Sequence, residues 1–329
     1  MRWTLWGLLG VVVLGALYWT FEPIIRGTDS ETTLAPSPAQ TPAGTPGPND
    51  PVLVGAGDIA SCASDGDEKT ALLLDQIVAT GIETVVFTAG DNAYESGTIQ
   101  EFEQCYGPSW GRHKDRTRPA LGNHEYKTGN ANGYFQYFGA SAGDPSKGYY
   151  SYDLGGWHIV VLNTNDHCNA LSCDASSAEE KWLRSDLAAS TTFCTIAIWQ
   201  DPRFSSSARA GGSHKVKPFW DALYDYGADL VVNADEHNYE RFAPQTPFGA
   251  LDPEYGIRQF VVGTGGRSLD IIDVPRQPNS EISNDDTLGV LKLTLHPAGY
   301  DWEFIPQAGF KFRDAGSGAC HAAPPPVNE

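Results

Sequence analysis

Residues 84–94 read Thr-Val-Val-Phe-Thr-Ala-Gly-Asp-Asn-Ala-Tyr, a run of β-branched and apolar residues that ends in glycine and aspartate. The run predicts a buried strand over residues 84–88, and Gly90 permits a sharp backbone turn directly after it. The same order occurs upstream, where the apolar run at residues 52–54 is followed by Gly57-Asp58. Two strands that each end in a Gly-Asp pair predict acidic side chains at one edge of a sheet.

Three further strand ends carry polar side chains of the same kind. They read Gly122-Asn123-His124-Glu125, then Gln200-Asp201 after an apolar run at 195–199, then Asp235-Glu236-His237 after a run at 229–232. In open α/β sheets, ligands bind outside the carboxyl ends of the strands. Carboxylates, amide oxygens, a phenol and imidazoles are metal ligands, so the five strand ends together predict a metal centre rather than a nucleophile triad.

Helical periodicity alternates with these strands. Apolar residues at helical spacing predict helices over residues 68–80, 177–188 and 217–226. Further apolar runs predict strands at 158–162, 259–262 and 290–295, and the alternating run at 300–304 predicts an edge or antiparallel strand. Strand–helix units followed by late antiparallel strands predict a layered α/β fold.

Composition limits the class of protein. The chain has 329 residues, of which 41% are hydrophobic, which is enough for a sizeable core and excludes wholesale disorder. Lys and Arg number 22 against 41 Asp and Glu, which gives a formal net charge of −19. So acidic a chain repels phosphate backbones, and a nucleic-acid partner bound through basic patches is excluded.

The amino terminus predicts export from the cytoplasm. Residues 1–27 hold one early positive charge, Arg2, and then an apolar stretch without charge as far as Glu22, which fits a signal peptide or a membrane anchor. The lack of a small-x-small cleavage site favours the anchor. Residues 28–50 are rich in Pro and Thr and predict an extended linker. The expected location is therefore extracytoplasmic, either secreted or anchored to the membrane through this segment.

The cysteine pattern agrees with export. Six cysteines follow the linker, and an even number in an exported chain predicts disulfides. Cys168 and Cys173 would close a short loop, and the sequence does not choose among the other pairings.

Taken together, the motifs resemble those of the calcineurin-like metallophosphoesterases, and Asp91-x-x-Tyr94 resembles the purple acid phosphatase-like branch. The resemblance covers residues 51–315 and leaves 316–329 as a tail. It implies a four-layer α/β/β/α sandwich with a two-metal site at the strand ends. The implied activity is hydrolysis of small phosphoesters, as a phosphomonoesterase that acts outside the cytoplasm through a metal-activated hydroxide.

The resemblance also implies roles for individual residues. Asp58, Asp91, Tyr94 and His237 match ligands of the first metal, which is Fe³⁺ in the purple enzymes, with Zn²⁺ or Mn²⁺ as alternatives. Asp91 matches the carboxylate that bridges both metals, and Asn123 matches a ligand of the second. His124 matches the catalytic imidazole that contacts phosphate or assists proton transfer.

The chain departs from the family pattern at the second metal. Gln200 and Asp235 stand where the family has histidines, which leaves a second ligand set made of oxygen donors. Oxygen donors suit Mn²⁺, Mg²⁺ or Ca²⁺, so we expect a hard, labile second cation or an empty second site. Asp201, Arg203 and His214 follow closely and are candidate substrate-binding residues.

Two alternative functions remain open from the sequence. One is a phosphodiesterase or nucleotidase on the same centre. The other is a catalytically impaired surface protein that retains the fold for binding. No protein partner is evident from the sequence, and the N-terminal segment, if uncleaved, would be the membrane contact.

Overall fold

A computed structural model describes residue 47 and residues 49–325, apart from 166, 170, 210 and 274. The expected leader at 1–27 and most of the linker at 28–50 lie outside the described residues. Among the residues described, no helix is both long and apolar enough to cross a membrane.

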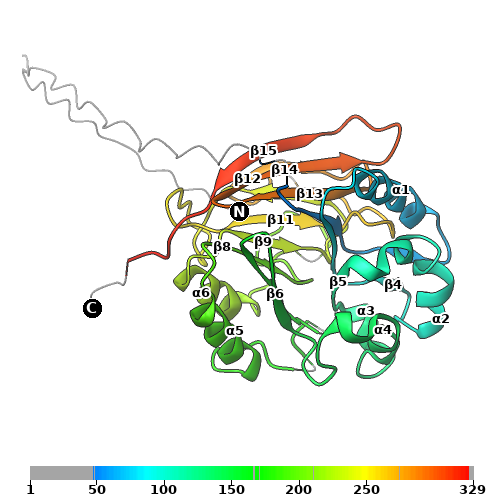
Figure 1. Ribbon diagram of the computed structural model, residues 1–329, viewed down its shortest axis with the longest axis horizontal. Helices are drawn as coiled ribbons and strands as arrows, with labels where there is room; N and C mark the ends of the chain where they lie inside the picture. The colour runs from blue at the N-terminus through cyan, green and yellow to red at the C-terminus, as the bar shows by residue number, and fades with distance from the viewer. Residues whose placement is uncertain are drawn as a thin grey trace, which may run out of the picture. The chain divides into compact units, whose positions relative to one another are not determined.

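Two mixed β-sheets form the centre of the fold (Figure 1). The six-stranded sheet has the order β15 (Asp314–Ala319), β14 (Gly299–Pro306), β13 (Gly289–His296), β1 (Val52–Ala56), β3 (Thr84–Ala89), β5 (Thr117–Ala120). The seven-stranded sheet has the order β12 (Ser280–Asn284), β10 (Tyr239–Phe242), β11 (Arg258–Val262), β9 (Leu230–Asn233), β8 (Cys194–Ile198), β7 (Trp157–Val161), β6 (Tyr150–Leu154). A short parallel pair joins β2 (Ala60–Ser61) to β4 (Ala93–Tyr94).

Helices cover the outer faces of both sheets. Helix α1 (Gly66–Val78) packs on β3 and β13, while α5 (Ala178–Ala189) and α6 (Lys217–Asp225) pack beside the seven-stranded sheet (Figure 1). The shorter helices are α2 (Ile99–Glu101), the π-helix Phe102–Tyr106, the 3₁₀ helix Trp110–Arg116, α3 (Asn123–Tyr126), α4 (Asn132–Phe138) and the 3₁₀ helix Gly139–Ala142. The expected helix–sheet–sheet–helix order is confirmed.

Alternation along the strands explains the layers. In β8, Ile196 and Ile198 belong to the core between the sheets, whereas Ala197 belongs to the cluster beneath α5 and α6. Successive side chains of a strand point to opposite faces, so an entirely apolar strand is buried on both sides. The helices supply the matching apolar faces with residues such as Leu183 and Phe219.

The order of the parallel strands brings the polar strand ends together. Strands β1, β3 and β5 run parallel, as do β7, β8, β9 and β11. The carboxyl ends of neighbouring parallel strands meet at one edge of a sheet, which is where the fold places its polar loops.

The carboxyl-terminal strands agree with the expectation in part. Strand β14 is antiparallel to both of its neighbours, β13 and β15, as one of the two expected alternatives has it, and it does not lie at an edge. The folded body also continues past residue 315, where the sequence placed the end of the catalytic domain. Strand β15 shows no apolar alternation, but Gly316 and Gly318 let it lie against Trp302 and Tyr300, where an added Cβ would come within 2.4 Å of each ring.

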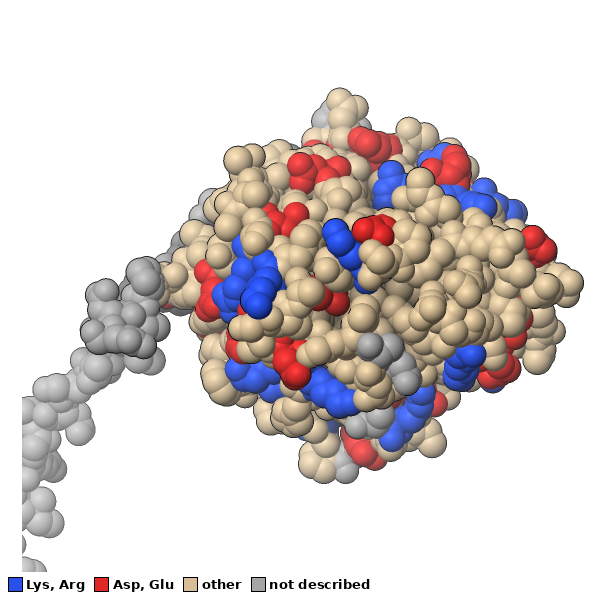
Figure 2. Space-filling view, turned by 90° about the horizontal axis from the view of Figure 1, so that it is seen from below, with Lys and Arg blue, Asp and Glu red and all other residues tan. Residues whose placement is uncertain are grey.

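Charge on the surface is mixed. On the face drawn in Figure 2, acidic and basic side chains are interspersed and separated by uncharged residues. The net charge of −19 is therefore not gathered into a single acidic field on that face.

All six cysteines are paired, which confirms the expectation of disulfides. The pairs are Cys62–Cys105, Cys168–Cys173 and Cys194–Cys320. The last of these joins β8 to the residue that follows β15, so it fixes the carboxyl terminus to the seven-stranded sheet.

We predict that the long disulfide contributes more stability than the short one. The bond Cys194–Cys320 spans 126 residues and Cys168–Cys173 spans 5. The entropy of closing such loops gives about 5 and about 2 kcal/mol respectively. Replacing each cysteine pair by serines should lower the free energy of unfolding in that order, as measured by denaturant titration. Equal losses would contradict this ranking.

Candidate metal centre

Three aspartates occupy unusual backbone positions at the strand ends. Asp58 follows β1, Asp91 follows β3 and Asp235 follows β9, and their φ angles are 56°, 48° and 66°. Left-handed backbone at a residue other than glycine costs about 1–3 kcal/mol and persists where the surrounding structure imposes it. Such strain at three carboxylates on neighbouring loops indicates that the fold holds these side chains for a function.

Hydrogen bonds join the first two loops. The Asp58 N–H donates to the Gly90 carbonyl at 3.2 Å, and the Ile59 N–H donates to the Asp91 carbonyl at 3.0 Å. The short β2–β4 pair continues this contact and brings Tyr94 alongside.

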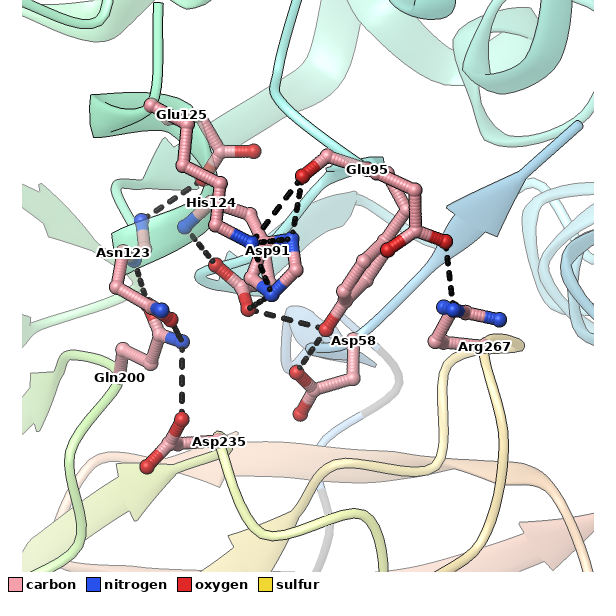
Figure 3. A network of polar contacts seen from close by, with 12 residues as sticks. Asp58, Asp91, Glu95, Asn123, His124, Glu125, Gln200, Asp235 and Arg267 are labelled. Carbon is pink, nitrogen blue, oxygen red and sulfur yellow. Dashed lines mark hydrogen bonds and ion pairs between the residues drawn. The ribbon is translucent and has the colours of Figure 1, made fainter.

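Three of the four predicted ligands of the first metal converge on the phenol oxygen of the fourth, Tyr94 (Tyr94 Oη). Tyr94 Oη donates to Asp58 Oδ1 at 2.6 Å and to Asp91 Oδ2 at 3.0 Å, and it lies 3.3 Å from His237 Nε2. His237 Nε2 also lies 3.3 Å from Asp58 Oδ1. In Figure 3, dashed lines join the carboxylates of Asp58 and Asp91 to one oxygen atom between them. The structure thus brings together residues far apart in the sequence.

These donors fit a cation. Asp58 Oδ2 is buried and has no hydrogen-bond partner among the described residues. A Cβ added at Gly263 would lie 2.5 Å from that oxygen, so glycine leaves room beside it. His237 Nδ1 makes a 2.7 Å hydrogen bond with Ser268 Oγ, which directs Nε2 toward Asp58 and Tyr94. Orientation of a ligating histidine through its other ring nitrogen is the usual arrangement at metal sites.

The electrostatics of the cluster also favour a cation. Burial, together with the charges of Glu125 and Asp58, raises the pKa of Asp91 well above its usual value. Burial and the charges of Asp58 and Asp91 raise the pKa of Tyr94 well above 10. Burial opposes ionisation of Asp58 too, but the nearby His237 lowers the pKa of Asp58 overall. Positive charge placed among these groups would favour their ionised, ligating forms.

The predicted second ligand set is adjacent. Gln200 Nε2 donates to Asn123 Oδ1 at 2.8 Å and lies 3.4 Å from Asp235 Oδ1 (Figure 3). A Cβ at Gly122 would lie 2.0 Å from Gln200 Oε1 and 2.1 Å from Asp91 Oδ1, so only glycine allows this approach. Gln200 Oε1 accepts the Asn123 N–H at 2.7 Å. The three side chains of the predicted second set therefore lie next to one another beside Asp91.

His124 lies over the first cluster. Its ring centroid is 4.3 Å from that of Tyr94, and its Nε2 is 3.8 Å from Asp91 Oδ2. Its Nδ1 lies 2.7 Å from the Glu95 carbonyl and 3.0 Å from Lys127 Nζ. Burial, and then the charge of Lys127, lower the pKa of His124. The imidazole is positioned to exchange a proton with a group bound at the cluster.

Glu125 supports the site and was not recognised from the sequence as a functional residue. It is fully buried, and its two carboxylate oxygens accept the N–H groups of Asn92 and Gly122, each at 2.8 Å. Burial raises the pKa of Glu125 to about 7. This side chain therefore ties the loop after β3 to the loop after β5.

The predicted substrate-binding residues divide into two groups. Asp201 lies beside Asp235, and its charge raises the pKa of Asp235, after burial, to about 7. Arg203 and His214 instead contact each other at 3.1 Å, and Arg203 Nη2 donates to the Pro247 carbonyl. Among the described residues, no hydrogen bond or ion pair joins either of these two to a predicted metal ligand.

Two residues near Asp235, His167 and Arg209, were missed. His167, on the loop after β7, contacts the Asp201 carboxylate through Nδ1. Arg209 places Nη2 at 3.7 Å from Asp235 Oδ1 and Nη1 at 3.6 Å from Asp270 Oδ2. His167 follows the apolar run at 158–162, so the strand-end rule applied there would have found it. The sequence around Arg209 carries no comparable signal.

Comparison with known proteins agrees with this geometry. A family model described as calcineurin-like phosphoesterase matches residues 52–239. Purple acid phosphatase 15 of Arabidopsis thaliana is 31% identical over 186 residues, an alignment covering 51% of this chain and 34% of that protein. The structure of purple acid phosphatase PPD1 from yellow lupin superposes with a TM-score of 0.73 at 19% identity, over 87% of this chain and 58% of that one.

A third similarity is to a protein of another description. A structure titled GAP50, the anchor in the inner membrane complex of Plasmodium, superposes with a TM-score of 0.63 at 13% identity, over 82% of this chain and 88% of that one. At these identities the structural matches establish the fold.

The family match covers more than half of the sequence, and the chain belongs to the calcineurin-like phosphoesterase family. Within that family it is purple acid phosphatase-like, as its curated relatives indicate. Membership of this family implies a dinuclear metal centre. The alignments span about a third of the length of these relatives.

We predict that the stability of chelator-treated protein falls as pH rises from about 4 to about 7. The pKa of Asp235 is raised from 3.8 to about 7, so in this window the folded chain keeps a proton that the unfolded chain has lost. Stability falls with pH wherever the folded state binds more protons. Urea titrations at several pH values measure how the free energy of unfolding changes with pH. This slope reflects the difference in protons bound by the folded and unfolded chains, and Asp235→Asn should reduce that difference by up to one proton.

Asp174→Asn is the control variant, because it removes an exposed carboxylate outside the buried cluster. Stability that increases with pH across this window would contradict the prediction.

Proposed function

We propose that this protein is a metal-dependent phosphomonoesterase that acts outside the cytoplasm. The observation that carries the proposal is the convergence of Asp58, Asp91, Tyr94 and His237 at hydrogen-bonding distance, with His124 directly above them. Family membership supports hydrolysis of a phosphoester at this centre. The Tyr94 phenol favours a first cation of the Fe³⁺ type, as in the purple enzymes that the sequence resembles.

The residues of the centre have distinct roles in this proposal. When bound, two cations supply an activated water as nucleophile and balance negative charge on the phosphoryl oxygens. Asp58, Asp91, Tyr94 and His237 would hold the first cation, and Asn123, Gln200 and Asp235 lie where the second would bind. His124 would donate a proton to the leaving oxygen, with Nε2 facing Asp91 and Nδ1 fixed at the Glu95 carbonyl.

Charge makes the cations essential for substrate binding. The chain carries a net charge of −19, and the centre itself is built from buried carboxylates. A phosphomonoester is a dianion near neutral pH, so the local positive field has to come from the metals and from the few cationic side chains at the rim. Lys127 and Arg267 are such side chains, since Lys127 contacts His124 and Arg267 lies 5.2 Å from the Tyr94 ring centroid.

Action outside the cytoplasm is supported by covalent structure. Three disulfides among six cysteines are typical of an oxidising compartment. The apolar N-terminal segment also supports export from the cytoplasm.

A second candidate is a catalytically impaired protein that uses the fold for binding. The observation that favours it is the replacement of two family histidines by Gln200 and Asp235. Loss of one strong electrostatic stabiliser commonly lowers the rate by ~10²–10³. An assay separates this candidate from the enzyme.

We predict hydrolysis of p-nitrophenyl phosphate that increases when Mn²⁺, Mg²⁺ or Ca²⁺ is added. The reason is that a weakly held second cation is lost on purification and restored by mass action. Asp91→Asn, which alters the carboxylate at the junction of both ligand sets, should abolish the activity. The ratio of rates on p-nitrophenyl phosphate and its bis ester distinguishes a monoesterase from a diesterase. Absence of any response to divalent cations at any pH would favour the impaired binding protein.

A further inference from the structure

A cluster of three ligating side chains lies next to the second ligand set. His167, Asp201 and Asp235 each offer one ligand atom, and these atoms all lie within 4.8 Å of one another. They come from the ends of β7, β8 and β9, which are neighbouring parallel strands. One further group of this kind occurs among the described residues. It consists of Cys194, Asp229 and Cys320, contains a disulfide and offers no thiolate.

Burial makes this cluster more than a surface collection of acids. Asp201 is 3% exposed and Asp235 is 4% exposed. Asp201 Oδ2 is buried without a hydrogen-bond partner among the described residues. Buried carboxylates this close repel one another unless a proton or a cation lies between them. An unpartnered carboxylate oxygen beside an imidazole and a second carboxylate is what a metal ligand set offers before the cation binds.

The loop that carries His167 is held in place from several sides. The disulfide Cys168–Cys173 closes it, Lys215 Nζ donates to the His167 carbonyl at 3.0 Å, and Asn165 Nδ2 donates to the Leu171 carbonyl at 3.1 Å. The Asp201 N–H donates to Thr164 Oγ1 at 3.4 Å, which connects this loop to the next strand end. The imidazole is therefore presented by a braced loop.

We propose that His167 and Asp201 bind the second cation together with Asp235. The family histidines missing at Gln200 and Asp235 would then be replaced in function by an imidazole from the neighbouring strand end. The inference deepens the proposed function and rests on it in assigning the cation to the phosphoesterase centre. The inference also changes which second metal is expected. A ligand set of nitrogen and oxygen prefers Zn²⁺, Co²⁺ or Mn²⁺ over Mg²⁺ and Ca²⁺.

The main rival is an internal cation. The Arg209 guanidinium donates to the Asp235 carbonyl through Nη1 and lies 3.7 Å from Asp235 Oδ1 through Nη2. If this guanidinium took the place of the second metal, the chain would bind one cation, and removing His167 would not change the number bound.

Metal titration of the full chain distinguishes these cases. Protein stripped with chelator is titrated with Mn²⁺, and bound and free metal are measured by calorimetry and by the electron paramagnetic resonance of free Mn²⁺. We expect two Mn²⁺ per chain. His167→Ala should weaken the lower-affinity site by at least about tenfold, since even partners outside the ligand shell affect affinity by 10–100-fold. The other site should be unchanged.

A change of ligand type provides a second variant. His167→Asp keeps a ligand but removes the nitrogen, so the lower-affinity site should remain and shift its preference from Zn²⁺ toward Mg²⁺ and Ca²⁺. His321→Ala and Asp174→Asn are the matched controls, because they remove an imidazole and an exposed carboxylate outside the cluster. Both should bind like the unaltered chain, and thermal unfolding confirms that each variant is folded.

Two results would overturn the inference. One is a His167→Ala protein that binds two Mn²⁺ with unaltered affinities. The other is an unaltered chain that binds one Mn²⁺ and gains a second when Arg209 is replaced by alanine. A chain that binds two cations in the predicted way and hydrolyses no phosphoester would count against the proposed function and leave the ligand set established.

Discussion

The structure depends on the enforced proximity of buried acids at the ends of parallel strands. Asp58 and Asp91 share the hydroxyl of Tyr94, and both carboxylates are fully buried. Water would stabilise their charges better than a protein interior does, so the fold tolerates them only with protons, hydrogen bonds or a cation nearby. The same burial raises the pKa of Asp91 and of Tyr94 well above their usual values. It also raises the pKa of Asp235, to about 7.

The rest of the fold keeps these groups in place. Two sheets bury a common core, and their parallel strands deliver loops to one region. The left-handed backbone of three aspartates directs their side chains into the site. Gly122, which has no Cβ, leaves room for Gln200 and Asp91 to come close. Glu125 then links two of the loops through backbone N–H groups. A cation that binds all of these donors would offset the backbone strain and the carboxylate repulsion together, which couples metal binding to stability.

Apolar runs that end in polar side chains were enough to predict a layered fold and a metal centre at the strand ends, because strand ends and ligand chemistry are both local features of the sequence. The assignment of Asp58, Asp91, Tyr94 and His237 to one cation came from the resemblance to a known family. Strand β15 could not be predicted, since its pairing relies on glycines that fit against Trp302 and Tyr300. Arg203 and His214 are near the site in sequence, yet they contact each other. His167 follows the apolar run at 158–162, so the strand-end rule could have found its contact with Asp201. Arg209 reaches Asp235 along a loop path that no local pattern records.

The central claim is that Asp58, Asp91, Tyr94 and His237 bind one cation. Its most direct test is visible absorption, combined with elemental analysis, of the chain loaded with Fe³⁺. A phenolate bound to Fe³⁺ is coloured, so the account predicts one tightly bound iron and an absorption band that Tyr94→Phe abolishes while iron remains bound through the other three ligands. Iron that fails to bind, or a band that persists without the Tyr94 hydroxyl, would contradict the account.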